Sequence, residues 1–192
     1  IPIKDNVANK KNEKSSEVIV TGGTSGIIDV RVIQSSDDAE EDDDDVYFAD
    51  DDLDMNEKDY VGLRFQGINI PQGATITNAY VQFTVEDEDG DKGNAEVKIY
   101  GQDDDNTLTF TTNDNDISSR PFTSAFVEWD IPNWHNENES GPAQTTPDLS
   151  PIVQEIVDRV GWANDSIVII IEEDKGKDRD AKAWDLDPSK AP

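Results

Sequence analysis

The chain has 192 residues, of which 44 are acidic and 16 basic, and its formal net charge is −28. This length fits one domain with an appendage, and so acidic a chain would be repelled by the phosphates of nucleic acids and by anionic membrane surfaces. Cysteine is absent, which excludes thiolate catalysis, disulfides and zinc–thiolate sites. No apolar run approaches the ~20 residues of a transmembrane helix, so we expect no membrane insertion.

The first 34 residues are predicted to form an N-terminal extension. Residues 1–16 are polar and without periodicity, which is typical of a tail that is disordered unless it is tied to something. Two strand-like segments follow, a β-branched one at 17–21 and an alternating one at 28–32; their apolar residues are Val18, Ile19, Val20, Ile28, Val30 and Val32. The chain begins at Ile1 without a charged-then-apolar leader, and we interpret it as a mature exported protein at the cell surface or outside the cell.

Residues 35–192 are predicted to form the main domain. Alternating or β-branched segments predict strands at 60–65, 76–85, 95–100, 107–111, 124–130 and 166–172. One helix is expected, because apolar residues recur at helical spacing, with Pro151 in the first turn and Gly161 at the end; they are Leu149, Ile152, Val153, Ile156, Val157 and Val160. Short strands with a single helix predict a mainly β fold, an antiparallel β-sandwich (jelly roll) with one short amphipathic helix.

The acidic residues come in short runs, which favours a bound cation. Two like charges ~4 Å apart repel by on the order of 4 kcal/mol at surface dielectric before salt screening. Calcium, which prefers carboxylate oxygens, would offset this repulsion. The predicted ligands are Asp42, Asp43, Asp44, Asp87, Asp89, Asp91, Asp103 and Asp105. A calcium-binding EF-hand at Asp87 is excluded, because lysines occupy the sixth and twelfth loop positions; the alternative for all these runs is a solvated acidic surface.

Catalysis is not predicted. His135 is the only histidine, no nucleophile motif accompanies it, and with so many acids any pair of carboxylates can be imagined as a glycosidase dyad. Tryptophans are the better candidates for a binding surface. Trp129 and Trp162 are expected in the core, whereas Trp134 has polar neighbours and is expected to be exposed, where it and the adjacent Asn133 and His135 would contact a polysaccharide.

A longer pattern carries a family resemblance. The segments 61–65 and 70–83, followed by Trp129, the Thr146-Pro147-Asp148-Leu149 run, Gly161-Trp162 and Ala191-Pro192, resemble the DNRLRE-type jelly-roll modules. These are secreted domains, similar to carbohydrate-binding modules, that occur in bacterial surface proteins and beside polysaccharide-degrading enzymes. The resemblance implies a jelly roll, often with structural calcium and sometimes with carbohydrate binding.

The chain departs from this family at both ends. The family continues past its Ala-Pro pair into a last strand, and it lacks the two strand-like segments before residue 35. A jelly roll without its last strand exposes an open groove, which residues 17–21 or 27–34 of a neighbouring molecule could fill by strand addition. Repeated head to tail, this contact makes a homopolymeric filament. The alternative is that the chain is truncated and its front segment pairs within its own domain.

The leading hypothesis is therefore an exported, calcium-stabilised structural protein that assembles into an extracellular filament or matrix. The alternative is a carbohydrate-binding module on a secreted or surface protein.

Overall fold

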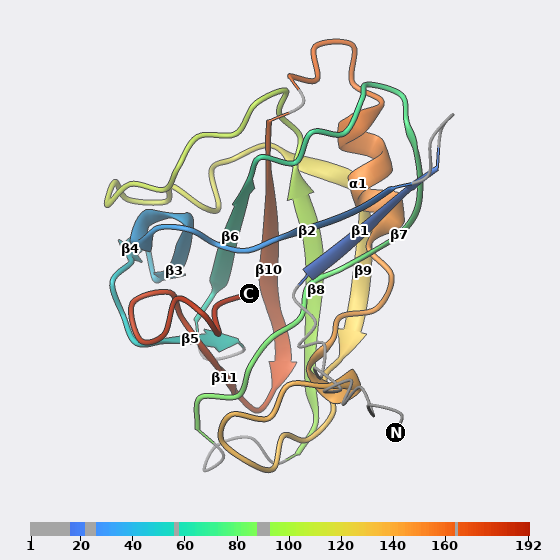
Figure 1. The fold of residues 1–192 in the computed structure, drawn as a ribbon. Helices are drawn as coiled ribbons and strands as arrows, with labels where there is room; N and C mark the ends of the chain where they lie inside the picture. The colour runs from blue at the N-terminus through green and yellow to red at the C-terminus, as the bar shows by residue number, and fades with distance from the viewer. Residues whose placement is uncertain (1–15, 22–25, 56–57, 88–92, 164) are drawn as a thin grey trace, which may run out of the picture.

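The computed structural model describes residues 16–21, 26–55, 58–87, 93–163 and 165–192, with backbone only for 16–21 (Figure 1). The described strands are β1 (Ser16–Thr21), β2 (Gly26–Val30), β3 (Asp38–Asp42), β4 (Asp45–Tyr47), β5 (Asp52–Met55), β6 (Tyr60–Gln66), β7 (Thr75–Tyr80), β8 (Ala95–Gln102), β9 (Phe122–Asp130), β10 (Ser166–Gly176) and β11 (Arg179–Lys182). The helical elements are η1 (Ser35–Asp37), α1 (Ser150–Val157) and η2 (Pro142–Gln144). The prediction of an antiparallel β-sandwich with one short helix is confirmed.

The larger sheet has the strand order β4-β3-β6-β10-β8-β9, and every neighbouring pair is antiparallel. β10 lies inside this sheet, and its continuous apolar run is buried on both faces. Ile167, Ile169 and Ile171 join the main core, while Val168 and Ile170 belong to a second apolar cluster on the outer face. Because side chains alternate along a strand, an unbroken apolar run is what a strand covered on both sides requires.

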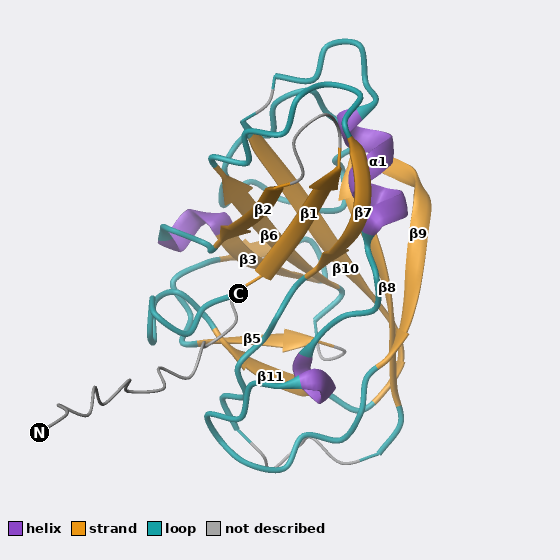
Figure 2. Ribbon diagram, turned by 45° about the vertical axis from the view of Figure 1, so that its right-hand side comes forward, coloured by secondary structure: helices purple, strands orange, loops and turns teal. Residues whose placement is uncertain are grey.

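The second sheet has the order β2-β1-β7 and lies across the inner face of the first (Figure 2). The main core fills the space between the two sheets, and helix α1 packs against β7 and β9. A short third sheet pairs β11 with β5 at one end of the sandwich. Both strands predicted in the N-terminal extension are formed, and they pair within the same chain, as the alternative interpretation of this segment had it.

Helix α1 follows its predicted apolar face only up to Val157. Asp148 Oδ1 accepts a hydrogen bond from the Ser150 amide at 2.8 Å, and Pro151 stands in the first turn. The prediction that Val160 continues the buried face is wrong, since this side chain is 99% exposed in the turn after the helix. No helix in the described part of the chain has the length and apolarity to cross a bilayer.

The strand predicted at 107–111 is wrong. Residues 103–121, called here the 103–121 loop, instead make an irregular excursion across the outer face of the larger sheet. Phe110 packs directly over Gly62, where an added Cβ would lie 2.5 Å from its ring, and the Phe110 amide donates to the Ser36 carbonyl. The Arg120 guanidinium lies over the face of the ring, 4.3 Å from its centroid. Long-range packing thus replaces local strand pairing here.

Candidate metal centre

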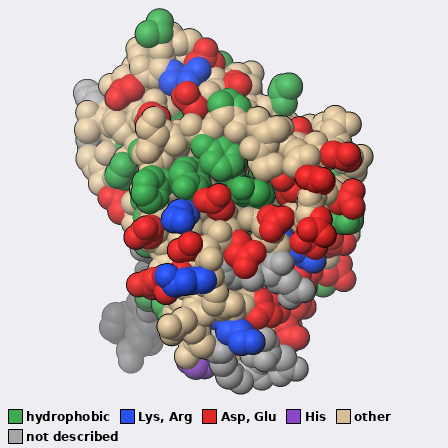
Figure 3. Space-filling view, turned by 180° about the vertical axis from the view of Figure 1, so that it is seen from behind, with side chains coloured by type: hydrophobic (Ala, Val, Ile, Leu, Met, Phe, Trp, Pro, Cys, Tyr) green, Lys and Arg blue, Asp and Glu red, His purple; other side chains and the backbone are tan. Residues whose placement is uncertain are grey.

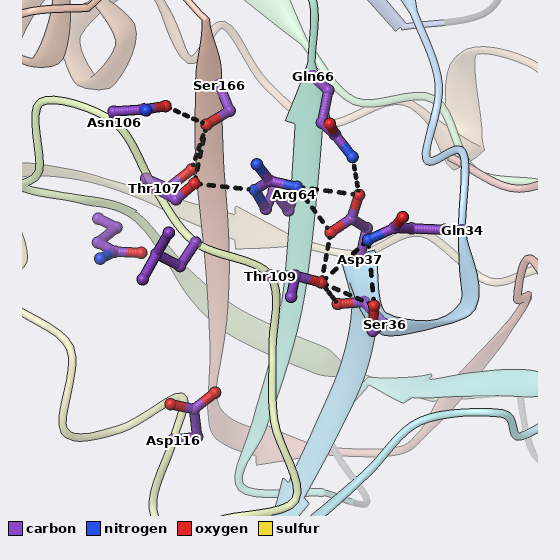
Figure 4. A network of polar contacts seen from close by, with 12 residues as sticks. Gln34, Ser36, Asp37, Arg64, Gln66, Asn106, Thr107, Thr109, Asp116 and Ser166 are labelled. Carbon is purple, nitrogen blue, oxygen red and sulfur yellow. Dashed lines mark hydrogen bonds and ion pairs between the residues drawn. The ribbon is translucent and has the colours of Figure 1, made fainter.

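Several buried acids are neutralised by other parts of the chain. Asp37 is the clearest case (Figure 4). Arg64 Nη1 donates to both of its carboxylate oxygens at 3.0 and 3.2 Å, Gln66 Nε2 donates at 2.5 Å and the Thr109 hydroxyl at 2.8 Å. Arg64 Nε donates in turn to the Thr107 carbonyl. With both charges buried, paired and hydrogen-bonded, this group needs no added cation.

Glu41 is satisfied by backbone donors instead of a cation. Its Oε2 accepts hydrogen bonds from the amides of Ile117 and Ser118 at 2.8 and 3.0 Å. Glu41 therefore fastens the 103–121 loop to strand β3.

The opposite face of β3 carries two acids that lack such compensation. Asp38 and Glu40 are each only 3% exposed. Asp38 Oδ2 accepts one hydrogen bond, from the Trp184 amide at 2.7 Å, and Glu40 Oε1 accepts one from the Asp54 amide. Within the described residues neither carboxylate forms an ion pair with lysine or arginine.

Burial changes the acid–base behaviour of this pair. It raises the pKa of Asp38 to about 7, with a further contribution from the nearby Asp185 carboxylate. Burial likewise raises the pKa of Glu40 to about 8, and Asp54 and Asp52 add repulsion. A buried carboxylate with too few donors binds either a proton or a metal ion. Asp38 and Glu40 are therefore the described acids most in need of a counter-charge.

Other carboxylates surround the same place. A small pocket with about 170 Å³ of free space, including its opening to solvent, is lined by Asp38, Glu40, Asp50 and Asp52 together with Tyr47, Phe48, Ala49, Leu53 and Ala183. Burial and the neighbouring Asp50 raise the pKa of Asp52. Asp185 Oδ2 is buried and has no hydrogen-bond partner among the described residues. We call Asp38, Glu40, Asp50, Asp52 and Asp185 the carboxylate cluster.

The donor set of this cluster fits calcium. It offers only carboxylate oxygens, without imidazole or thiolate, and its members come from β3, from the start of β5 and the turn before it, and from the segment after β11. Calcium accepts oxygen ligands in adaptable geometry, whereas magnesium demands a near-ideal octahedron. In the described part of the chain no three acidic or histidine side chains already converge at metal-binding distance. Calcium binding here would therefore draw the carboxylates together.

The acids predicted as ligands around residue 43 lie outside this pocket. The Asp42 carboxylate is 3.7 Å from Lys58 Nζ, which partly neutralises it. Asp43 occupies the β3–β4 turn in left-handed conformation (φ 57°), and its neighbour Asp44 is exposed. The acids of this run that line the pocket lie earlier in the chain, at positions 38 and 40. The alternation Asp38-Ala39-Glu40 would place both acids on the same face of a strand, and this pattern could have identified them from the sequence.

Two further predicted ligands already have a cation from the protein. Arg159 Nε donates to Asp105 Oδ1 at 2.7 Å, and Arg159 Nη1 contacts Asp103 Oδ1. Of the third predicted group, Asp87 is exposed, and Asp89 and Asp91 lie outside the described residues. Of these predicted ligands, the described ones, Asp87, Asp103 and Asp105, do not line the pocket at Asp38 and Glu40.

The predicted exposure of Trp134 is wrong. Its side chain is 0% exposed, lies 6.4 Å from the Phe83 ring between centroids and donates from Nε1 to the Ala143 carbonyl at 3.0 Å. The flanking Asn133 and His135 are exposed, whereas the Trp134 side chain between them points into the core. Trp134 is not available to stack on a sugar. The core positions predicted for Trp129 and Trp162 are confirmed.

No family model, curated protein or solved structure matches the chain. The resemblance of residues 35–192 to DNRLRE-type modules therefore stays a prediction.

Proposed function

We propose that this protein is an exported structural β-sandwich that assembles by exchanging strand β1 between copies, and that calcium at the carboxylate cluster stabilises it. One observation carries the proposal. β1 is the middle strand of its sheet and pairs along its length with β2 on one side and β7 on the other. Both of these flanking strands are anchored to the body of the sandwich by contacts that do not involve β1.

The β2 side of the slot is fixed through the end of the chain. The Val32 amide donates to the Pro192 carbonyl at 2.9 Å, and Arg31 Nη1 donates to the Ala191 carbonyl at 3.0 Å. Val32 itself is buried in the main core, and Ile28 and Val30 pack against it. Of the two N-terminal segments first considered as donors, residues 27–34 therefore belong to the acceptor.

The β7 side is fixed by α1 and by the residue that precedes it. The Leu149 amide donates to the Ala79 carbonyl at 2.7 Å, and Gln154 Oε1 accepts from the Ile76 amide at 2.8 Å. These bonds hold the edge of β7 that faces away from β1. The slot between β2 and β7 is thus built by residues 26–192, and β1 fills it with backbone pairing.

An identical β1 from another copy would make the same ladder. Strand exchange of this kind needs no new interface, because each bond made between copies replaces one made within a copy. If each molecule gives its strand to the next, the contact is head to tail and does not close on itself, which produces a filament. The strand that is exchanged would be β1 alone.

Calcium would stabilise the β-sandwich by neutralising the negative charge of the carboxylate cluster. Asp38 and Glu40 would hold the ion with Asp50, Asp52 and Asp185 as the remaining candidates, which would tie three segments of the chain together. Extracellular modules bind calcium with dissociation constants of roughly 10⁻⁴–10⁻³ M, which suits an exported protein. Because Trp134 is buried, no described contact favours the alternative of a carbohydrate-binding module.

Disulfide trapping tests the exchange directly, because the chain has no cysteine of its own. Glu17 in β1 is the paired partner of Tyr80 in β7, and paired residues of antiparallel strands lie within disulfide range. Glu17→Cys protein mixed with Tyr80→Cys protein should give a disulfide-linked heterodimer. In the double variant, exchange should give a ladder of covalent multimers, whereas intrachain pairing gives only a closed monomer.

The matched control pairs Glu17→Cys with Thr112→Cys, an exposed position in the 103–121 loop. This mixture should give no more heterodimer than random collision does. Closed monomers alone from the double variant, at every protein concentration, would rule the exchange out.

A further inference from the structure

A partly exposed aromatic surface lies on the outer face of the larger sheet, opposite the face that carries Asp38 and Glu40. Four rings form it, and we call them the aromatic patch: Tyr60, Tyr100, Phe122 and Phe126. Successive centroids are 6.1, 5.1 and 5.6 Å apart, from Tyr60 through Phe122 and Tyr100 to Phe126. Phe126 is 49% exposed. Seen from behind, hydrophobic side chains gather in the middle of this face with charged ones around them (Figure 3).

The strand register places charged residues beside the rings. Glu172 of β10 is paired with Tyr60 and with Lys98, and Lys98 is paired with Glu128. Cross-strand partners share a face of the sheet, so these side chains border the patch. The Tyr60 hydroxyl donates to Glu172 Oε1 at 3.3 Å. The patch is therefore a mixed surface of aromatic rings and fixed carboxylates.

This border has a surplus of negative charge. It contains two lysines, each paired with one acid: Lys98 with Asp174 at 3.2 Å and Lys175 with Glu96 at 2.6 Å. Three more carboxylates have no ion-pair partner within the described residues; they are Glu128, Asp130 and Glu172. Five acids against two lysines leave a balance of −3 on this face.

We infer that the aromatic patch and its carboxylates bind a lysine- or arginine-bearing polypeptide segment. Cations are attracted both to exposed ring faces and to carboxylates, and a protein of net charge −28 steers cationic partners toward itself. The Tyr60 and Phe122 rings stand at 72° to each other, so the four rings are not the flat platform on which a sugar chain stacks. A second copy would bring the same surplus of carboxylates and be repelled.

Fluorescence anisotropy with a labelled octalysine peptide tests this inference on the full chain. Phe126→Ala should weaken binding about two- to fivefold, which is the range of an exposed cation–π contact. The Glu128→Gln/Asp130→Asn double variant should weaken it about three- to tenfold, and raising the salt concentration should weaken all binding. Phe126, Glu128 and Asp130 are all exposed, so the fold should tolerate these changes.

Two controls separate a built surface from diffuse attraction. Asp114→Asn removes an exposed charge and Val160→Ala an exposed apolar group elsewhere, and each should leave the affinity nearly unchanged, because neither residue belongs to the patch or its border. Equal losses in Asp114→Asn and the double variant, or no effect of Phe126→Ala, would overturn the inference. So would absence of peptide binding. Phe126-dependent binding of a neutral β-glucan, or Phe126-dependent dimerisation, in place of peptide binding would overturn it as well.

Discussion

The carboxylate of Asp38 accepts a hydrogen bond over 2.7 Å from the backbone amide of Trp184, a residue 146 positions further along the chain. This contact joins strand β3 to the segment that follows β11. The carboxylate that accepts it is buried, which raises its pKa, and the charge of Asp185 raises this pKa further. The charge of Asp38 therefore bears on how these two segments hold together.

Calcium should stabilise the protein through this group. An ion that binds only the folded state at a hundred times its dissociation constant adds about 2.7 kcal/mol, which corresponds to a rise in Tm of about 5–10 °C for a domain of this size. Asp38→Asn keeps an acceptor for the Trp184 amide but loses the charge, and most of the calcium-dependent rise should disappear. Differential scanning calorimetry with calcium and with EDTA measures both values.

The matched control is Asp44→Asn, which removes a charge from an exposed acid of the same run. Its calcium response should equal that of the unaltered protein. An undiminished calcium response in Asp38→Asn would contradict a site at the carboxylate cluster.

The metal-free protein should lose stability as the pH rises from about 4.5 to about 8. The pKa values of Asp38 and Glu40 lie near 7 and 8 in the folded state, against 3.8 and 4.5 for the exposed groups. The folded state therefore binds more protons in this window, so the free energy of unfolding decreases with pH, by on the order of several kcal/mol in total. Urea denaturation in EDTA across this range measures the slope.

Saturating calcium should reduce or reverse this slope, because a bound ion favours the charged carboxylates. A free energy of unfolding that rises with pH in EDTA would show that Asp38 and Glu40 are compensated in another way.

Breaking the buried pair of Arg64 and Asp37 should be severe. Arg64→Met leaves the Asp37 carboxylate buried with only neutral donors, and removal of one member of a buried ion pair costs about 3–5 kcal/mol. The Arg64→Met/Asp37→Leu double variant should recover part of this loss. Lys98→Met, which breaks the half-exposed contact with Asp174, should cost at most about 1 kcal/mol. Chemical denaturation distinguishes these outcomes, and equal losses for Arg64→Met and Lys98→Met would contradict them.

Gly62→Ala should displace the 103–121 loop. An added Cβ would lie 2.5 Å from Phe110 Cζ, and overpacking of this kind costs about 1–3 kcal/mol. Gly62→Ala/Phe110→Leu should restore part of the stability by making room. Gly26→Ala is the matched control, because no atom lies within 4 Å of the new Cβ. Hydrogen exchange at the Phe110 amide reports on the loop, and unchanged protection in Gly62→Ala would contradict the proposed contact.

The elements that were predicted correctly are those whose pattern is local. The unbroken run Ile167–Ile171 forms the buried first half of β10, and the helical spacing of Ile152 and Ile156 forms the buried face of α1. The failures involve partners distant in sequence. Residues 107–111 have strand-like composition, but Phe110 is held by Gly62 and Arg120 instead of a neighbouring strand. Trp134 has polar neighbours, but its ring is buried beside Phe83.

By itself the sequence determined that the chain is strongly acidic, lacks cysteine and alternates as strands do, because charge, composition and periodicity are properties of neighbouring residues. Only the tertiary structure decided which acids are compensated. Arg64 reaches Asp37 across 27 positions and Arg159 reaches Asp105 across 54, while Asp38 and Glu40 form no ion pair with lysine or arginine within the described residues. Compensation of a charge depends on what folding brings within a few ångströms, and spacing along the chain does not contain that information.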